Sequence, residues 1–196
     1  MKKKLIVITV VFYIFFVSYV SFANEIDEGL QNIFALITNE NWIDAKAALQ
    51  QEEKNTAELS LLWSLWYGGL SNPKYDKHKS TRYLEQASKL GSRDAQLLLI
   101  GRYLFSSDPD YTNYSAGVKL ATNLADFYEN EISNGRDKDG ELQRIIGKFY
   151  IFGIGVTKNS DHGLDLIKKA AKLGDKEAIS ILQNKKVETI GHALKN

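Results

Sequence analysis

Apolar residues recur at intervals of three or four positions along most of the chain, from about residue 25 to about residue 185. This spacing places them on one face of an α-helix, and no segment alternates apolar and polar residues as a half-buried strand does. Glycine, proline and clusters of polar residues separate the periodic segments, so the pattern predicts an all-α chain. The predicted helices are Glu25–Thr38, Trp42–Glu53, Ala57–Tyr67, Lys77–Leu90, Arg93–Phe105, Ser115–Ile132, Glu141–Phe152, Ser160–Leu173 and Lys176–Lys185, with a short helical tail after Val187.

Two stretches of the chain match one another without a gap at an interval of 83 residues. Ala87–Leu99 aligns with Ala170–Leu182, and the same interval superimposes Tyr67 on Tyr150. Each stretch is typical of a helix end, a glycine that can take a positive φ, and the start of a new helix. Repetition at identical positions is what packing demands, so we assign these residues to structure and not to a site. They are Tyr67, Tyr150, Ala87, Ala170, Gly91 and Gly174.

The first 23 residues have the pattern of an export signal. Three lysines precede an uncharged apolar run, Leu5–Val17, and small residues at Ser21 and Ala23 form the site that a signal peptidase accepts. We therefore expect cleavage between Ala23 and Asn24 and export to the periplasm. The alternative is an uncleaved membrane anchor, because Leu5–Ala23 is about long enough to span ~30 Å of hydrocarbon.

Composition excludes several kinds of chemistry. The chain has no cysteine, which rules out disulfides, thiolate zinc sites, iron–sulfur clusters and a cysteine nucleophile, and an exported protein without cysteine fits a bacterial periplasm. Lysine and arginine number 25 against 24 acidic residues, so the net charge of +1 supplies no general basic field for nucleic acid. We expect no nucleic-acid partner.

The segment Ile146–Val156, followed by Asn159 and by Lys169–Ala178, resembles a Sel1-like repeat. The family pattern has Leu-Gly, a tyrosine three residues later, Gly-x-Gly-Val, an acidic residue, Lys-Ala-Ala, and then glycine and alanine. Asn159 and Gly163 depart from it, since aspartate and alanine are usual at those positions. The resemblance implies a right-handed α-solenoid of antiparallel helix pairs, related to tetratricopeptide arrays, whose stacked repeats share one core.

The resemblance extends over most of the chain in weaker form. A degenerate copy precedes this segment, and a copy expanded by about ten residues around a polar loop lies between the two. The implied organisation is a signal peptide at 1–23, capping helices at 24–58, a degenerate repeat at 59–94, an expanded repeat at 95–141, a repeat at 142–178 and a capping helix at 179–196.

No catalytic constellation stands out in the sequence. Ser160-Asp161-His162 holds the residue types of a hydrolase triad, but neighbours at a helix start do not converge, and Ser160 is better interpreted as an N-cap. Gly153-Ile-Gly155 lacks the preceding strand of a dinucleotide fingerprint, and three scattered histidines do not predict a metal site. We expect a non-enzymatic protein without cofactor or metal.

Aromatic and basic residues suggest a protein-binding surface. Trp66 and Tyr67 are adjacent on one helix, so both cannot point squarely into one core, and Phe149 with Tyr150 is the equivalent pair. We therefore take Trp66, Phe149, Arg102 and Lys148 as candidate partner-binding residues in the groove of the array, because aromatic residues and arginine are enriched at binding hot spots. The alternative is that all of these aromatic residues pack between helices.

Members of the Sel1-like family are generally adaptors, regulators or inhibitors in bacterial cell envelopes, and the resemblance implies the same class of function here. We expect a periplasmic interaction module that binds one partner protein in its concave groove. One concrete version is an immunity protein that neutralises a toxin delivered into the periplasm, such as a secreted lipase. Alternatives are a regulator or scaffold of envelope sensors or peptidoglycan enzymes and, less favoured, a β-lactamase-like hydrolase, for which the chain lacks a Ser-x-x-Lys motif at Ser88 and Ser160.

Overall fold

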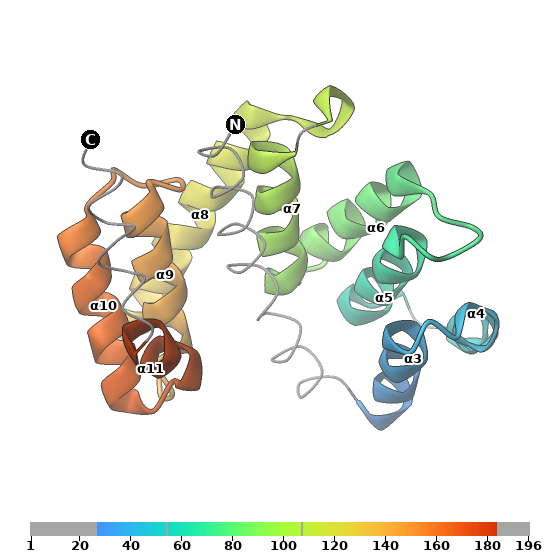
Figure 1. Ribbon diagram of the computed structural model, residues 1–196, viewed down its shortest axis with the longest axis horizontal. Helices are drawn as coiled ribbons and strands as arrows, with labels where there is room; N and C mark the ends of the chain where they lie inside the picture. The colour runs from blue at the N-terminus through green and yellow to red at the C-terminus, as the bar shows by residue number, and fades with distance from the viewer. Residues whose placement is uncertain (1–26, 54, 107, 184–196) are drawn as a thin grey trace. The chain divides into compact units, whose positions relative to one another are not determined.

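The computed structural model describes residues 27–53, 55–106 and 108–183, and within these ranges all regular structure is helical (Figure 1). The prediction of an all-α fold is confirmed. The helices are α3 (Glu28–Thr38), α4 (Trp42–Gln51), α5 (Ala57–Gly68), α6 (Lys77–Lys89), α7 (Arg93–Phe105), the 3-10 helix η1 (Pro109–Tyr111), α8 (Tyr114–Ser133), α9 (Glu141–Phe152), α10 (Ser160–Leu173) and α11 (Lys176–Gln183).

The predicted helices match the observed ones to within three residues at every end that the structure describes. Side chains explain several of the starts: the Asp27 carboxylate accepts a hydrogen bond from the Leu30 amide, and Thr56 caps α5 in the same way. Asn159, and not Ser160, is the N-cap of α10, so that interpretation was wrong by one position. The predicted signal peptide and the tail after Val187 lie outside the described residues.

The chain divides into two compact units, unit 1 up to Gly117 and unit 2 from Val118 onward. In unit 1, α5 and α6 form an antiparallel hairpin, α7 packs against α6, and α3 and α4 pack against α5. Leu62, Leu84 and Ile100 are buried at their contacts. Burying these side chains stabilises the unit, because each contributes about 1.5–3 kcal/mol relative to full exposure.

In unit 2, α9 and α10 form the corresponding hairpin, and α11 packs against α10. Its centre contains Ile146, Phe149 and Ile167, all essentially inaccessible to solvent. The turn after α9 is tied to α8, where Thr122 donates a 2.7 Å hydrogen bond to the Gly155 carbonyl. Gly155 has φ +69°, and a Cβ there would lie 2.5 Å from the backbone of α8, so only glycine fits.

The first turn of α9 is capped by a side chain from the preceding loop and not by the N-cap residue itself. Gly140, at the N-cap, has φ +89° and offers no side chain, and a Cβ on it would lie 2.6 Å from the Ala170 carbonyl oxygen. The Asp137 carboxylate instead accepts hydrogen bonds from the Leu142 and Gln143 amides at 3.1 and 3.0 Å. The polar loop before α9 therefore serves both the helix start and the close approach to α10.

The two hairpins end their second helix in the same way, as the sequence predicts. Gly91 and Gly174 follow α6 and α10 with φ of +98° and +97°, the left-handed conformation expected of a helix-ending glycine. The amide after each glycine donates a hydrogen bond back into the last turn of the helix, from Ser92 to the Ala87 carbonyl at 2.9 Å and from Asp175 to the Ala170 carbonyl at 3.1 Å.

The start of the second helix is also equivalent in the two hairpins. The Asp76 amide donates to the Tyr67 carbonyl at 2.9 Å, and 83 residues later the Asn159 amide donates to the Tyr150 carbonyl at the same distance. Each of these residues caps its helix through its own side chain, Asp76 to the Lys79 amide and Asn159 in α10. The two loops thus close with one geometry.

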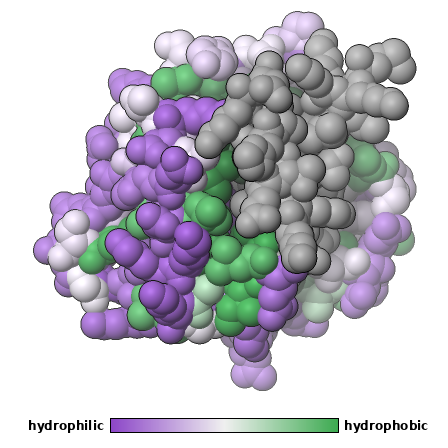
Figure 2. Space-filling model, turned by 60° about the vertical axis from the view of Figure 1, so that its left-hand side comes forward, coloured by the Kyte–Doolittle hydropathy of each residue, from purple (hydrophilic) through white to green (hydrophobic). Residues whose placement is uncertain are grey.

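In the view of Figure 2, hydrophilic side chains cover much of the coloured surface, and hydrophobic side chains form patches between them. Leu70 and Ile43 are the most exposed large hydrophobic residues among those described, at 86% and 82%. Within the described residues, no helix has both the length and the apolar character needed to cross a bilayer. Isolated exposed apolar residues of this kind are normal for folded proteins.

Candidate functional site

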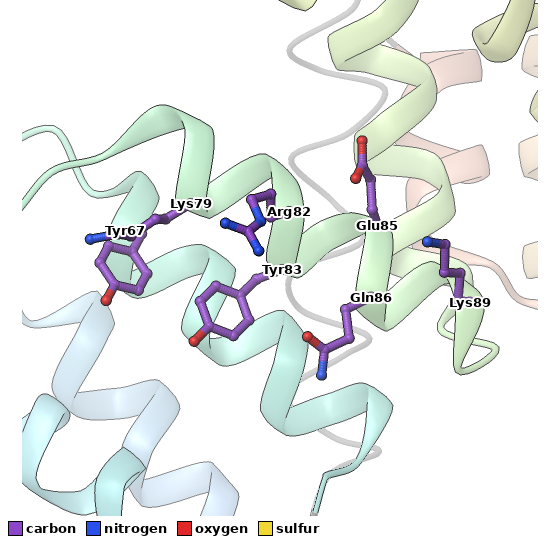
Figure 3. A pocket seen from close by; sticks show the side chains of 7 residues that line it. All are labelled: Tyr67, Lys79, Arg82, Tyr83, Glu85, Gln86 and Lys89. Atoms are coloured by element: carbon purple, nitrogen blue, oxygen red, sulfur yellow. The ribbon is translucent and has the colours of Figure 1, made fainter.

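An open groove of about 490 Å³ lies along α6 of unit 1, beside the end of α5 (Figure 3). We call it the aromatic–basic groove. Its lining combines two tyrosine rings with three cationic side chains, one carboxylate and one amide. The lining residues are Tyr67, Lys79, Arg82, Tyr83, Glu85, Gln86 and Lys89.

The two tyrosine rings that line the groove belong to a cluster of three nearly parallel rings, whose third member is Trp63. Tyr67 and Tyr83 lie 5.7 Å apart between ring centroids with planes 11° apart, and Trp63 lies 5.9 and 5.8 Å from them. Because all three centroid distances are similar, the rings lie side by side in a triangle and not in one column. The rings are held in place by one another, so they lose little side-chain entropy when a ligand binds. This property is typical of aromatic residues at binding hot spots.

The charged part of the groove is positive. Lys79 Nζ lies 5.1 Å from the centroid of the Tyr67 ring, and Arg82 and Lys89 are exposed to solvent. The carboxylate of Glu85 accepts a 2.7 Å hydrogen bond from the Tyr103 hydroxyl on α7. Lys79 also forms a 3.5 Å ion pair with Asp76, which leaves Arg82 and Lys89 as the cations that make the groove favour a negatively charged ligand.

Two phenols at the groove, that of Tyr83 in its lining and that of Tyr103 bonded to Glu85, are neutral at physiological pH. Burial, followed by the nearby Tyr67 ring, raises the pKa of Tyr83, and burial together with the Glu85 hydrogen bond raises the pKa of Tyr103. Their hydroxyls therefore act as hydrogen-bond groups, and the charge of the groove comes from lysine and arginine.

Local sequence explains how the groove forms. Lys79, Arg82, Gln86 and Lys89 are spaced by three or four positions on α6, so they share the face of the helix opposite its buried residues. The aromatic side chains that contact this face come from α5, one turn apart at positions 63 and 67. An amphipathic helix packed beside an aromatic one is sufficient to build the site.

The hairpin of unit 2 carries a different surface at the same positions. The interval of 83 residues puts Leu166 in place of Tyr83, Ile146 in place of Trp63, and Asp165 in place of Arg82. Asp165 forms an exposed 3.3 Å ion pair with Lys168, which replaces Glu85. Tyr150 and Lys172 keep the residue types of Tyr67 and Lys89, and Ile146 and Leu166 are buried aliphatic residues. The hairpin framework therefore requires neither Trp63 nor Tyr83, which makes this added aromatic pair a candidate for function.

Two of the four residues predicted to face a partner are buried. Trp66 is 2% exposed and Phe149 0%, so the expectation that they reach a groove surface was wrong. Trp66 turns inward because its indole N–H donates a 2.9 Å hydrogen bond to the Trp42 carbonyl of α4. The neighbouring Tyr67, which we had assigned to packing, is the half-buried member of the pair and lines the groove.

Lys148 is also inaccessible, at 4% exposure, which contradicts its prediction as a contact residue. Its ammonium lies 2.5 Å from Glu177 Oε1 in an ionic cluster under α11. Arg144 joins the cluster, 2.7 Å from Glu177 Oε2 and 2.9 Å from Asp175 Oδ2. Burial lowers the pKa of Lys148, and the attraction of Glu177 opposes this effect.

Arg102 is half-buried on α7. Its guanidinium donates hydrogen bonds to the hydroxyls of Ser80 and Thr81 on α6. It lines a different pocket from the aromatic–basic groove, so the four predicted residues do not converge on one site.

The residues considered for catalysis do not assemble a reactive site. The His162 ring packs edge-on against Tyr150, with centroids 4.6 Å apart. Across the described ranges, no group of three or more histidine and carboxylate side chains is placed to hold a metal ion.

Sequence reasoning missed Tyr67, Tyr83, Lys79 and Arg82 as the residues that form a surface together. The available signal was the spacing of the basic residues on one face of α6 together with Trp63 and Tyr83, whose counterparts Ile146 and Leu166 are aliphatic. No protein-family model matches the chain, and neither a curated protein nor a solved structure is significantly similar to it.

Proposed function

We propose that this protein is a non-enzymatic interaction module that binds one partner protein through the aromatic–basic groove. The supporting observation is the contrast between the hairpins: Trp63, Tyr83 and Arg82 are absent from the equivalent face of α9 and α10. Exposed tyrosine with arginine is the combination typical of interface hot spots. The excess of cations favours a partner that presents an acidic segment.

The proposal includes the architecture and location that the sequence suggests. The two hairpins are copies of a Sel1-like repeat in a right-handed solenoid, and the chain acts in the periplasm after export. The matching helix ends and loop hydrogen bonds support a common repeat. In this setting the partner is a toxin delivered to the periplasm, such as a secreted lipase, and the protein is its immunity protein or inhibitor.

A direct test is binding of the purified protein to the product of the neighbouring gene, measured by calorimetry. The test variants exchange groove residues for their counterparts in unit 2, Tyr83→Leu and Arg82→Asp. Each is expected to weaken binding by about tenfold or more, as hot-spot substitutions do. The matched control variants, Asp165→Ala and Lys168→Ala, alter exposed residues of the other hairpin and leave the affinity unchanged.

Three outcomes decide between functions. Loss of affinity in the groove variants alone supports the proposal, and equal affinity in all variants contradicts the groove as the binding site. A neighbouring product that is an envelope sensor or a peptidoglycan enzyme, bound with the same pattern, would replace the immunity role with a regulatory or scaffolding one.

A further inference from the structure

The aromatic–basic groove has a pattern of charge along its length. Figure 3 shows Tyr67 at one end and Lys89 at the other, with Arg82 between them. Arg82 and Lys89 are exposed, and within the described residues neither side chain forms an ion pair or a hydrogen bond. Two cations at separate positions are therefore available to a ligand.

The spacing of these two cations is set by α6. Arg82 and Lys89 are seven residues apart, close to two full turns, so their side chains leave the same face of the helix. Their backbone positions are about 10.5 Å apart along the axis, because an α-helix rises 1.5 Å per residue. An extended chain covers about 10 Å in three residues. Two carboxylates three positions apart in an extended segment thus match the two cations.

The stretch of the groove between the cations disfavours a further acid. Glu85 lies there in the sequence, and its carboxylate is held at the groove by the 2.7 Å hydrogen bond from the Tyr103 hydroxyl. Its neighbour Gln86 is neutral, and its amide donates a 2.6 Å hydrogen bond to Asn55. A ligand carboxylate in the middle would face a like charge and no cation. The groove therefore favours neutral residues between the two acids.

The end of the groove away from Lys89 is aromatic. The half-buried rings of Tyr67 and Tyr83 lie there with their centroids 5.7 Å apart. Such rings bind an apolar side chain, as aromatic residues at interfaces do. Because Tyr83 adjoins Arg82 in the sequence, this apolar residue lies next to the first acid of the ligand.

We infer that the partner enters this groove with a short extended segment in which two acidic residues, three positions apart, are separated by neutral residues and adjoined by an apolar one. The inference rests on the proposed function and specifies what the partner presents. An extended segment meets both cations at least cost, because a helix of only two turns is marginal in water. General attraction to any acidic run would give no preference for this spacing.

Three synthetic peptides, acetylated and amidated at their ends, test the spacing. The first has the order phenylalanine, glutamate, two serines, glutamate and phenylalanine, so it fits in either chain direction. The second has the same composition with the two glutamates adjacent, and the third has glutamates in place of both serines. Each is titrated into the purified full chain by calorimetry at physiological ionic strength, where exposed charges more than about 8 Å apart are largely screened.

We expect the spaced peptide to bind about three- to fivefold more tightly than the adjacent one, because the adjacent acids reach only one of the two exposed cations. The peptide with four acids should bind no more tightly than the spaced peptide, despite its greater charge. Equal or tighter binding of the adjacent peptide, tighter binding of the four-acid peptide, or no binding of the spaced peptide in the millimolar range overturns the inference.

Arg82→Gln and Lys89→Gln test the assigned cations. Each is expected to abolish the preference for the spaced peptide over the adjacent one. Lys172→Gln changes the exposed counterpart of Lys89 in unit 2, so it is the matched control and leaves the preference unchanged. A preference that persists in both groove variants overturns the assignment, and circular dichroism checks that each variant is folded.

Binding of the neighbouring gene product to the same variants separates this inference from the proposed function. If Tyr83→Leu weakens binding of that protein but the spaced and adjacent peptides bind equally, the spacing is wrong and the groove stands as the partner site. If the peptides show the expected preference but the groove variants bind that protein as the unaltered chain does, the spacing stands and the proposed partner is wrong.

Discussion

The hairpins α5–α6 and α9–α10 share their backbone geometry and differ in the chemistry of the side chains on it. Both place a left-handed glycine after the second helix, and both close the first loop with a 2.9 Å hydrogen bond to a tyrosine carbonyl. The first hairpin buries serines at its helix crossing and exposes aromatic rings, whereas the second buries glycines and ions. One set of local backbone signals therefore supports two different surfaces and two different interiors.

The ionic cluster of unit 2 makes the difference clearest. Arg144 and Lys148 occupy the positions of Leu61 and Leu65, and Glu177 occupies the position of Asp94. Leu61 packs in an apolar interior, but Arg144 and Lys148 are stable there only because Glu177 and Asp175 supply opposite charges. An interior built from ions depends on every member, while an apolar interior tolerates single losses better.

The largest effect is expected from Arg144→Leu, which installs the residue of the first hairpin. The substitution leaves Asp175 and Glu177 buried without their main cation, and we expect it to lower the free energy of unfolding by about 3–5 kcal/mol. Urea unfolding followed by circular dichroism measures the change.

The matched variant for this test combines Arg144→Leu with Lys148→Leu and Glu177→Gln. It removes the charges of Lys148 and Glu177 together with that of Arg144 and leaves only Asp175 without its cation, so it should recover part of the lost stability. A loss below about 1 kcal/mol in the single variant would show that the cluster is solvated, and would remove the distinction between the two interiors.

The next effect concerns the helix crossing. Gly163→Ser gives the second hairpin the residue found at Ser80, and its Cβ would lie 2.7 Å from Ile151 Cγ1 and against the Gly147 carbonyl. We expect a cost of about 1–3 kcal/mol from overpacking. The reverse change, Ser80→Gly, creates no clash but removes the hydroxyl bonded to Ser64 and Arg102, and should cost about 1–2 kcal/mol. A cost below about 0.5 kcal/mol for Gly163→Ser in thermal unfolding would mean that the second crossing is as wide as the first.

A smaller effect is expected from Tyr83→Leu, which removes a ring packed against Trp63 and Tyr67. The loss of these aromatic contacts should lower the free energy of unfolding by about 0.5–1.5 kcal/mol. Leu166→Tyr, the opposite exchange in the second hairpin, puts a larger ring at a buried position that has Ile146 in place of Trp63, so it should not stabilise. Stabilisation by Leu166→Tyr in chemical denaturation would contradict this view of the groove.

The smallest effect concerns Tyr150, which matches Tyr67 at the interval of 83 residues. The Tyr150 hydroxyl donates a 2.5 Å hydrogen bond to Glu129 on α8, and this bond, followed by burial, raises the pKa of Tyr150 to about 12 from an ordinary value of 10.0. Because the folded pKa is raised, its contribution to stability is complete below pH 10.0 and is lost as the pH rises toward 12.

Ultraviolet titration of the unaltered protein against Tyr150→Phe isolates this phenol. We expect its absorbance change near pH 12, and a stability loss in Tyr150→Phe of about 0.5 kcal/mol at neutral pH because the bond is exposed to solvent. Ionisation of Tyr150 near its ordinary pKa would show that the bond to Glu129 does not persist in solution.

Local signals in the sequence determined the helices and their ends. The glycine after each second helix, the caps at Asp27 and Thr56 and the three-to-four-residue apolar spacing all act within a few residues along the chain. Such interactions are readable from sequence because the interacting groups lie within one or two turns of each other.

Tertiary contacts decided which side chains reach solvent. Trp66 and Tyr67 are equivalent candidates in sequence, and the choice between them depends on a carbonyl 24 positions away in α4. Lysine is usually found at the protein surface, yet Lys148 is buried because it pairs with a glutamate 29 positions away. Whether a particular side chain is buried depends on partners that the fold brings together from distant parts of the chain. The free energy of such a contact cannot be deduced from the local pattern of either segment alone.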